Sequence, residues 1–150
     1  MRTVYEYQAS VLLSLARSKI VRHPFSLRLH LLDTASLHAK LRSETPDGHV
    51  RGWRLRNRAV LFFSEEILIT EGQVTRPAYC YAYEQLIPQP DGSDVRFFFR
   101  FELENLPPTP QKPQPHLHVA GTHPNAHKIH FPSPLITLAD VLALVHHHLL

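Results

Sequence analysis

Hydrophobic positions recur at helical spacing in two segments of the chain, residues 5–20 and residues 137–149. We predict that the first helix ends before Pro24, because a residue that precedes proline is disfavoured in the helical conformation. The second helix is predicted to begin at Thr137, with Asp140 three residues later as an acidic partner near the positive end of the helix dipole.

Between these helices the hydrophobic pattern changes to a period of two, which is typical of strands with one buried face. The predicted strands cover residues 25–31, 37–41, 50–55, 59–63, 67–70, 74–86, 95–103 and 116–120. Most are separated by turn-forming residues, and the last follows a segment with five prolines, residues 106–115, which is predicted to be an extended connection.

This order of elements predicts an α+β fold. We expect one domain, residues 1–150, with a single antiparallel β-sheet and the N- and C-terminal helices packed on one of its faces. The side chains expected to be buried beneath the helices are Leu27, Leu29, Phe97, Phe99 and Phe101.

Composition favours a soluble, cytoplasmic protein. Of 150 residues, 43% are hydrophobic, and no apolar run approaches the ~20 residues of a membrane span, so we expect no membrane association. Glu6 and Gln8 stand where a signal peptide requires apolar residues. Cys80 is the single cysteine, which excludes an internal disulfide and a zinc site built from several cysteines.

Positive charge is concentrated in one part of the chain. Residues 17–58 contain ten Lys or Arg and three Asp or Glu, although the whole chain has a net charge of only +3. The candidate residues for binding nucleic acid, through phosphate charge and base stacking, are Arg51, Trp53, Arg54, Arg56 and Arg58. Solvated strand residues remain an equally good interpretation of this cluster.

His116 and His118 form the most informative local motif. They are two positions apart in a predicted strand, so both imidazoles should lie on one face, opposite Leu117 and Val119. Such a pair can act as general acid and base or as two metal ligands, and its spacing is equally typical of ordinary polar residues on the solvent face of a strand. His127 and His130 could add ligands. Because residues 106–137 contain no acidic residue or cysteine, we expect no tightly bound metal and no cofactor.

Arg100 is the third candidate catalytic residue. It lies on the strand face opposite Phe99 and Phe101, where a guanidinium could bind two phosphate oxygens beside the histidines. We expect Arg100, His116 and His118 to converge on a patch open to solvent, suited to cleaving a phosphodiester without a metal. His146, His147 and His148 are consecutive on a helix, cannot share one face, and are not assigned to a site.

Several motifs in the second half of the chain resemble the TumE-like toxin family of bacterial toxin–antitoxin modules. They are the R-x-x-Y-x-Y-x-Y run ending at Tyr83, the F-R-F triplet around Arg100, the H-x-H-V motif at His116 and a final helix after Pro134. The resemblance covers roughly residues 60–145. It implies a cytoplasmic toxin whose partner is a DNA-binding, helix-turn-helix antitoxin, and this type of system suggests RNA as the target.

The leading hypothesis is therefore a toxin-like protein that cleaves RNA with His116 and His118 as base and acid and Arg100 stabilising the transition state. A homodimer is possible in this hypothesis. Two alternatives stay open: a non-catalytic module that binds a protein partner on its open sheet, and a metal-dependent hydrolase whose ligands are histidines.

Overall fold

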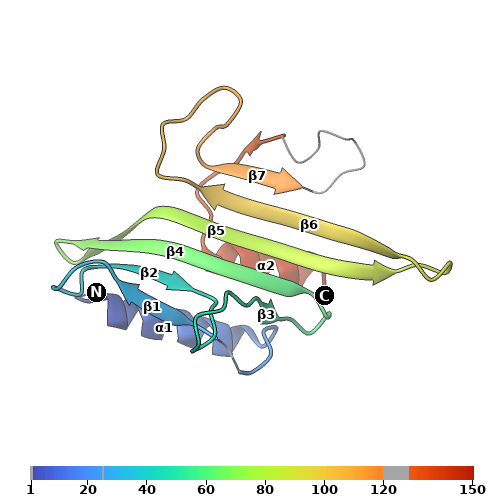
Figure 1. Ribbon diagram of the computed structural model, residues 1–150, viewed down its shortest axis with the longest axis horizontal. Helices are drawn as coiled ribbons and strands as arrows, with labels where there is room; N and C mark the ends of the chain where they lie inside the picture. The colour runs from blue at the N-terminus through green and yellow to red at the C-terminus, as the bar shows by residue number, and fades with distance from the viewer. Residues whose placement is uncertain (1, 25, 120–128) are drawn as a thin grey trace.

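The computed structural model describes residues 2–24, 26–119 and 129–150, and it confirms the predicted α+β class (Figure 1). Its elements, in chain order, are α1 (Val4–Ser18), β1 (Arg28–Leu31), β2 (His38–Arg42), β3 (Trp53–Arg54), β4 (Val60–Thr70), β5 (Gln73–Pro88), β6 (Asp94–Leu103), β7 (His116–Val119), β8 (Phe131–Pro132) and α2 (Leu138–His148). None of the helices in the described ranges is long and apolar enough to cross a membrane.

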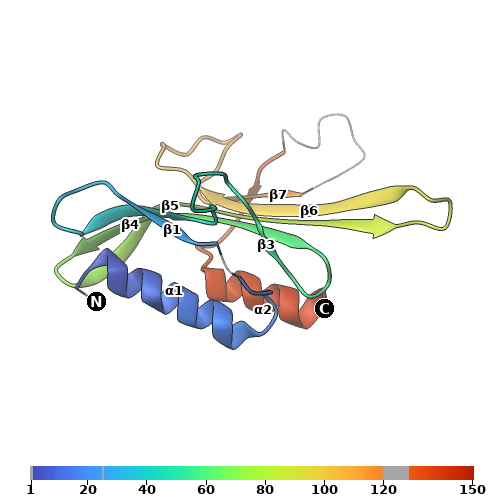
Figure 2. The same ribbon diagram turned by 60° about the horizontal axis from the view of Figure 1, so that its bottom comes forward.

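The strands form one sheet in the order β1-β2-β4-β5-β6-β7-β8, with β3 paired to β4 beside this path. The pairings between these strands are antiparallel. Both helices lie on the same side of the sheet, and no described helix covers its other side, which we call the open face (Figure 2).

The central strands are longer than the sequence pattern predicts. The two segments predicted at 59–63 and 67–70 belong to one strand, β4, because Glu65 and Glu66 continue the alternation instead of breaking it. Glu65 points into the core and Glu66 towards the open face. The strand predicted at 50–55 is reduced to the two residues of β3.

Burial under the helices agrees with the prediction for part of the expected core. Phe99 is buried, whereas Leu27, Leu29 and Phe101 are only half-buried at the margins of the core. The prediction for Phe97 is wrong, because its side chain is 39% exposed. Phe97 lies nearer than Phe99 to the turn of the β5–β6 hairpin, and this hairpin extends beyond the ends of both helices (Figure 1).

α2 begins as the sequence predicts. The hydroxyl of Thr137 accepts a hydrogen bond from the backbone N–H of Asp140 at 3.1 Å, and the carboxylate of Asp140 accepts one from the backbone N–H of Thr137 at 2.8 Å. This reciprocal capping box satisfies donors that a helix N-terminus leaves free.

A buried carboxylate, Glu65, links the sheet to both helical segments. It accepts hydrogen bonds from the hydroxyls of Tyr7 on α1, at 2.6 Å, and Tyr81 on β5. Arg76 lies 3.6 Å from the same carboxylate, and donates at 2.7 Å to the carbonyl of Ile136, just before α2. Burial raises the pKa of the Glu65 carboxyl, and the hydrogen bonds from the two tyrosines and the charge of Arg76 counter this effect.

We expect Glu65→Ala to lower the free energy of unfolding by about 3 kcal/mol, because it removes the carboxylate beside the partly buried Arg76 and leaves the hydroxyls of Tyr7 and Tyr81 without their acceptor. Urea denaturation of the purified variant measures this loss. The matched control is Glu84→Ala, which removes a carboxylate from an exposed pair with Arg96 and should cost under about 1 kcal/mol. Equal losses in the two variants would contradict a linking role for Glu65.

Candidate functional site

The register between β6 and β7 brings four chemically active side chains together on the open face. Arg100 is the cross-strand partner of His118, and Glu102 is the partner of His116. Phe99 and Phe101 pair with Val119 and Leu117, whose side chains therefore lie on the opposite, helix-bearing side. His116 and His118 thus lie side by side, as their spacing predicts, with ring centroids 4.9 Å apart.

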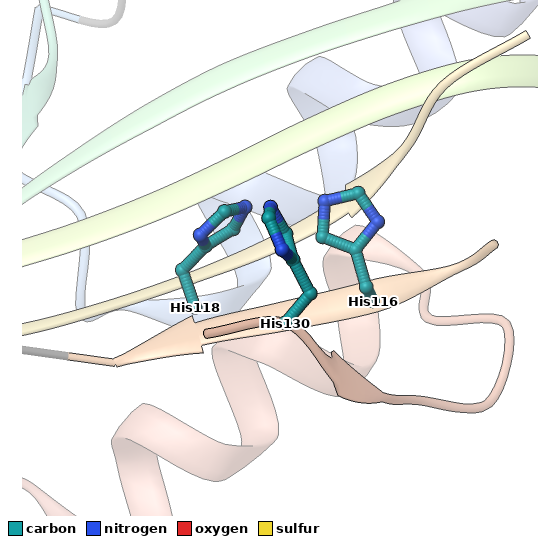
Figure 3. Close-up of side chains that lie close together, drawn as sticks. All are labelled: His116, His118 and His130. Atoms are coloured by element: carbon teal, nitrogen blue, oxygen red, sulfur yellow. The ribbon is translucent and has the colours of Figure 1, made fainter. Parts of the chain in front are cut away.

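A third imidazole joins this pair from a segment far along the chain. His130, just before β8, has its ring centroid 4.9 Å from that of His116 and 4.5 Å from that of His118. Figure 3 shows its ring between the other two. One nitrogen from each imidazole can be chosen so that all three lie within 4.8 Å of one another. His127, the other ligand considered from sequence, lies outside the described residues.

The histidines are buried, which corrects the expectation of a patch open to solvent. His116 is 0% exposed and His118 is 8% exposed. β8 pairs with β7 at the edge of the sheet, and the ring of His130 packs over both other rings. The sequence does not reveal this cover because β8 has only two residues and lies where no strand is predicted, between the strand at 116–120 and the helix at 137–149.

Hydrogen bonding leaves ring nitrogens of this cluster without partners. His116 Nδ1 lies 2.8 Å from the carbonyl oxygen of Pro113 and must donate to it, because a carbonyl can only accept. In the neutral imidazole this tautomer places the lone pair on Nε2 of His116, which is buried and has no hydrogen-bond partner in the described part of the chain. His130 Nδ1 is in the same situation. Each such buried nitrogen costs about 1–3 kcal/mol.

His118 is held in its neutral form. Burial lowers its pKa to about 4, and the nearby positive charge of Arg100 acts in the same direction. Nη2 of Arg100 donates to Nε2 of His118 at 3.2 Å, which requires a lone pair on that nitrogen.

An acidic side chain does lie beside the histidines, contrary to the expectation based on neighbouring sequence. Glu102 Oε2 lies 3.5 Å from His116 Nε2 and 3.4 Å from His118 Nε2. It also lies 3.2 Å from Nε of Arg100. Glu102 precedes the proline-rich segment in the sequence, but the β6–β7 pairing places it directly opposite His116.

The predicted nucleic-acid cluster is divided between surface and core. Arg51, Arg54, Arg56 and Arg58 are exposed. Trp53 is only 2% exposed, stacks on Phe63 at a centroid distance of 5.1 Å, and donates from its indole N–H to the carbonyl of Ser26. It therefore has no free ring face for a base, and nucleic-acid binding by the four arginines stays a prediction.

Comparisons with protein families, with curated proteins and with solved structures find no match to this chain. The resemblance to TumE-like toxins therefore stays an expectation, and the argument about function depends on the geometry of the site.

The low pKa of His118 makes stability depend on pH. In the unfolded chain this imidazole takes up its proton near pH 6.5, whereas in the folded protein it does so only near pH 4. Between these values the unfolded state binds more protons, so His118 should reduce the free energy of unfolding as pH falls from about 6.5 to 4, by up to about 1.4 kcal/mol per pH unit.

Chemical denaturation of the metal-free protein at a series of pH values tests this dependence. We expect His118→Asn to be less sensitive to pH in this range, and His146→Asn, which changes an exposed residue of α2, to behave as the wild type. An unchanged slope in His118→Asn would contradict a neutral, buried His118.

Proposed function

We propose that this protein binds one divalent transition-metal ion, of which zinc fits best, through His116, His118 and His130. The observation that carries the proposal is the convergence of three imidazole nitrogens within 4.8 Å, two of whose side chains, His116 and His130, have a buried ring nitrogen with no hydrogen-bond partner among the described residues. A metal ion supplies the missing partner for these lone pairs, and neutral imidazole is the form that binds it.

Glu102 supports the same proposal through its distances. Zinc bonds of about 2.0–2.1 Å in tetrahedral geometry place neighbouring ligand atoms roughly 3.3 Å apart. The Glu102 carboxylate oxygen is already 3.5 and 3.4 Å from Nε2 of His116 and His118. Small movements of His130 and of the two other rings would complete a site with three imidazoles and one carboxylate.

Two further groups have the contacts expected of an outer coordination shell. The carbonyl of Pro113 fixes the tautomer of His116, which leaves Nε2 free to bind the ion. Arg100 contacts both Glu102 and His118. When the ion takes the lone pair of His118, the guanidinium loses that contact and keeps its pairing with Glu102, which orients the carboxylate.

The chemical class that this arrangement supports best is a metal-dependent hydrolase. A zinc ion lowers the pKa of a bound water to about 7 and so provides hydroxide at neutral pH. In a catalytic site of this kind a water would occupy the fourth position in place of Glu102, and the carboxylate, held by Arg100, would be the group that accepts its proton.

We expect the metal-free protein to bind one zinc ion per chain and to melt at a higher temperature once loaded, because the ion binds the folded state. His116→Ala and His130→Ala should each weaken zinc binding by more than about 100-fold, since even outer-shell changes cost 10–100-fold. Competition with a chromogenic zinc chelator measures the affinity.

The matched control is the double variant His146→Ala/His147→Ala, which also removes imidazoles but from the exposed face of α2. It should keep the wild-type affinity. Zinc binding lost equally in the control, or retained in His116→Ala, would contradict the proposed site.

A second candidate function is the toxin-like cleavage of RNA without a metal. The 3.2 Å contact between Arg100 and His118 favours it, because a phosphate bound by the guanidinium would lie beside an imidazole. The helix-turn-helix antitoxin, the homodimer and the cytoplasmic location belong to this candidate and stay predictions.

One assay separates the two candidates. Labelled RNA is incubated with purified protein, with and without EDTA, beside His116→Ala and Arg100→Ala. If the main proposal holds, any cleavage stops in EDTA and returns with zinc. Cleavage that persists in EDTA but is lost in His116→Ala would establish the metal-free alternative instead.

A further inference from the structure

A hollow of about 370 Å³ lies on the open face of the sheet, beside the proposed metal site. Glu102 forms part of its wall on β6, and Lys40 and Arg42 form the wall on β2. The hollow therefore extends across the sheet from a pair of cations to the carboxylate next to the histidines. Its volume is within the range of small-molecule sites, about 300–1,000 Å³.

The floor of the hollow consists of three short side chains on the central strands, Ser64, Ala78 and Cys80. Ser64 on β4 pairs with Cys80 on β5, and the next pair on this face places Ala78 beside Glu66. The flanking strands carry long side chains in the same rows. Short residues between long ones leave a depression in a sheet face that no described helix covers.

The acidic side chains of the hollow are already paired with cations or histidines. Glu66 lies 2.7 Å from Nε2 of His38, and Glu104 lies 2.5 Å from the ammonium group of Lys112. Glu102 faces Arg100 and the histidine cluster. These contacts reduce the repulsion that the three carboxylates would exert on an anion in the hollow.

The wall on β2, formed by Lys40 and Arg42, carries positive charge that is not fully neutralised by carboxylates. Lys40 is exposed and has no ion-pair partner among the described residues. Arg42 lies 3.0 Å from Glu44, but this single carboxylate also pairs with Arg28 at 3.5 Å and His30 at 2.8 Å. One carboxylate thus faces two guanidinium groups, and Lys40 adds a further positive charge.

We propose that this hollow binds a small molecule carrying a phosphate monoester, with the phosphate at Lys40 and Arg42 and the remainder lying over Cys80 towards Glu102. A phosphate dianion matches two neighbouring cations, and a guanidinium can bind two of its oxygens. A nucleotide and a sugar phosphate share this chemistry. Binding itself depends only on the hollow, whereas any reaction of the ligand rests on the proposed metal site.

Isothermal titration calorimetry on the full chain, both metal-free and zinc-loaded, tests this inference with adenosine 5′-monophosphate, ribose 5-phosphate and adenosine. We expect the phosphorylated compounds to bind and adenosine to bind at least about tenfold more weakly. Tighter binding of the nucleotide than of ribose 5-phosphate would identify a nucleotide site, and equal binding would identify a site for the phosphate and sugar alone.

Two variants locate the binding. Lys40→Ala should weaken it about tenfold or more, because the variant loses a charged hydrogen bond to the phosphate. Ala78→Leu should also weaken it, because the larger side chain fills the floor without changing charge. The control is Arg56→Ala, which removes an exposed cation that does not line the hollow. Melting temperatures verify that each variant is folded.

The inference is overturned if no phosphorylated compound binds, or if Lys40→Ala and Ala78→Leu bind as tightly as the Arg56→Ala control. It fails separately from the metal proposal. If zinc binds and no phosphate compound binds, only the proposal for the hollow is contradicted. If phosphate binding depends on Lys40 but the protein does not bind zinc, only the proposal for the metal site is contradicted.

Discussion

Two pairings between β6 and β7 on the same face of the sheet determine the chemistry of this protein: Arg100 lies opposite His118, and Glu102 lies opposite His116. Because side chains alternate between the faces of a strand, this register places all four groups on the open face and the intervening apolar residues on the side of the helices. A shift of one residue would move the imidazoles towards the helix-bearing side and separate them from Glu102. The long pairings of β4 with β5 and of β5 with β6 support this register from within the sheet.

Most of the fold follows from alternation that can be read in the sequence. The helices, the β5–β6 hairpin and the strand at His116 are all predicted near their observed places, because each has a clear period or a strong turn. Phe97 is predicted wrongly because a strand pattern does not tell where the helices above it end. The continuity of β4 is missed because Glu65 interrupts the apolar run in the sequence, although hydrogen bonds from Tyr7 and Tyr81 allow its burial.

The site is less predictable than the fold because its members come from different parts of the chain. The shared face of His116 and His118 follows from their spacing, but His130 joins them through a two-residue strand with no sequence signal. Glu102 is missed because the search for acidic residues covers only the sequence next to the histidines. The proline-rich segment separates Glu102 from His116 along the chain, although the two residues are paired in the sheet. The burial of His116 and His118 also depends on His130 and β8. This burial changes the interpretation from an exposed acid–base pair to a metal site.

The central claim is that three imidazoles and the Glu102 carboxylate hold one metal ion. X-ray absorption spectroscopy at the zinc edge, on protein loaded with one equivalent of zinc, measures the ligands directly. The account predicts three imidazole nitrogens and one oxygen at about 2.0–2.1 Å, with one imidazole fewer in His130→Ala. A shell made mainly of water oxygens, or a wild-type spectrum that His130→Ala leaves unchanged, would contradict it.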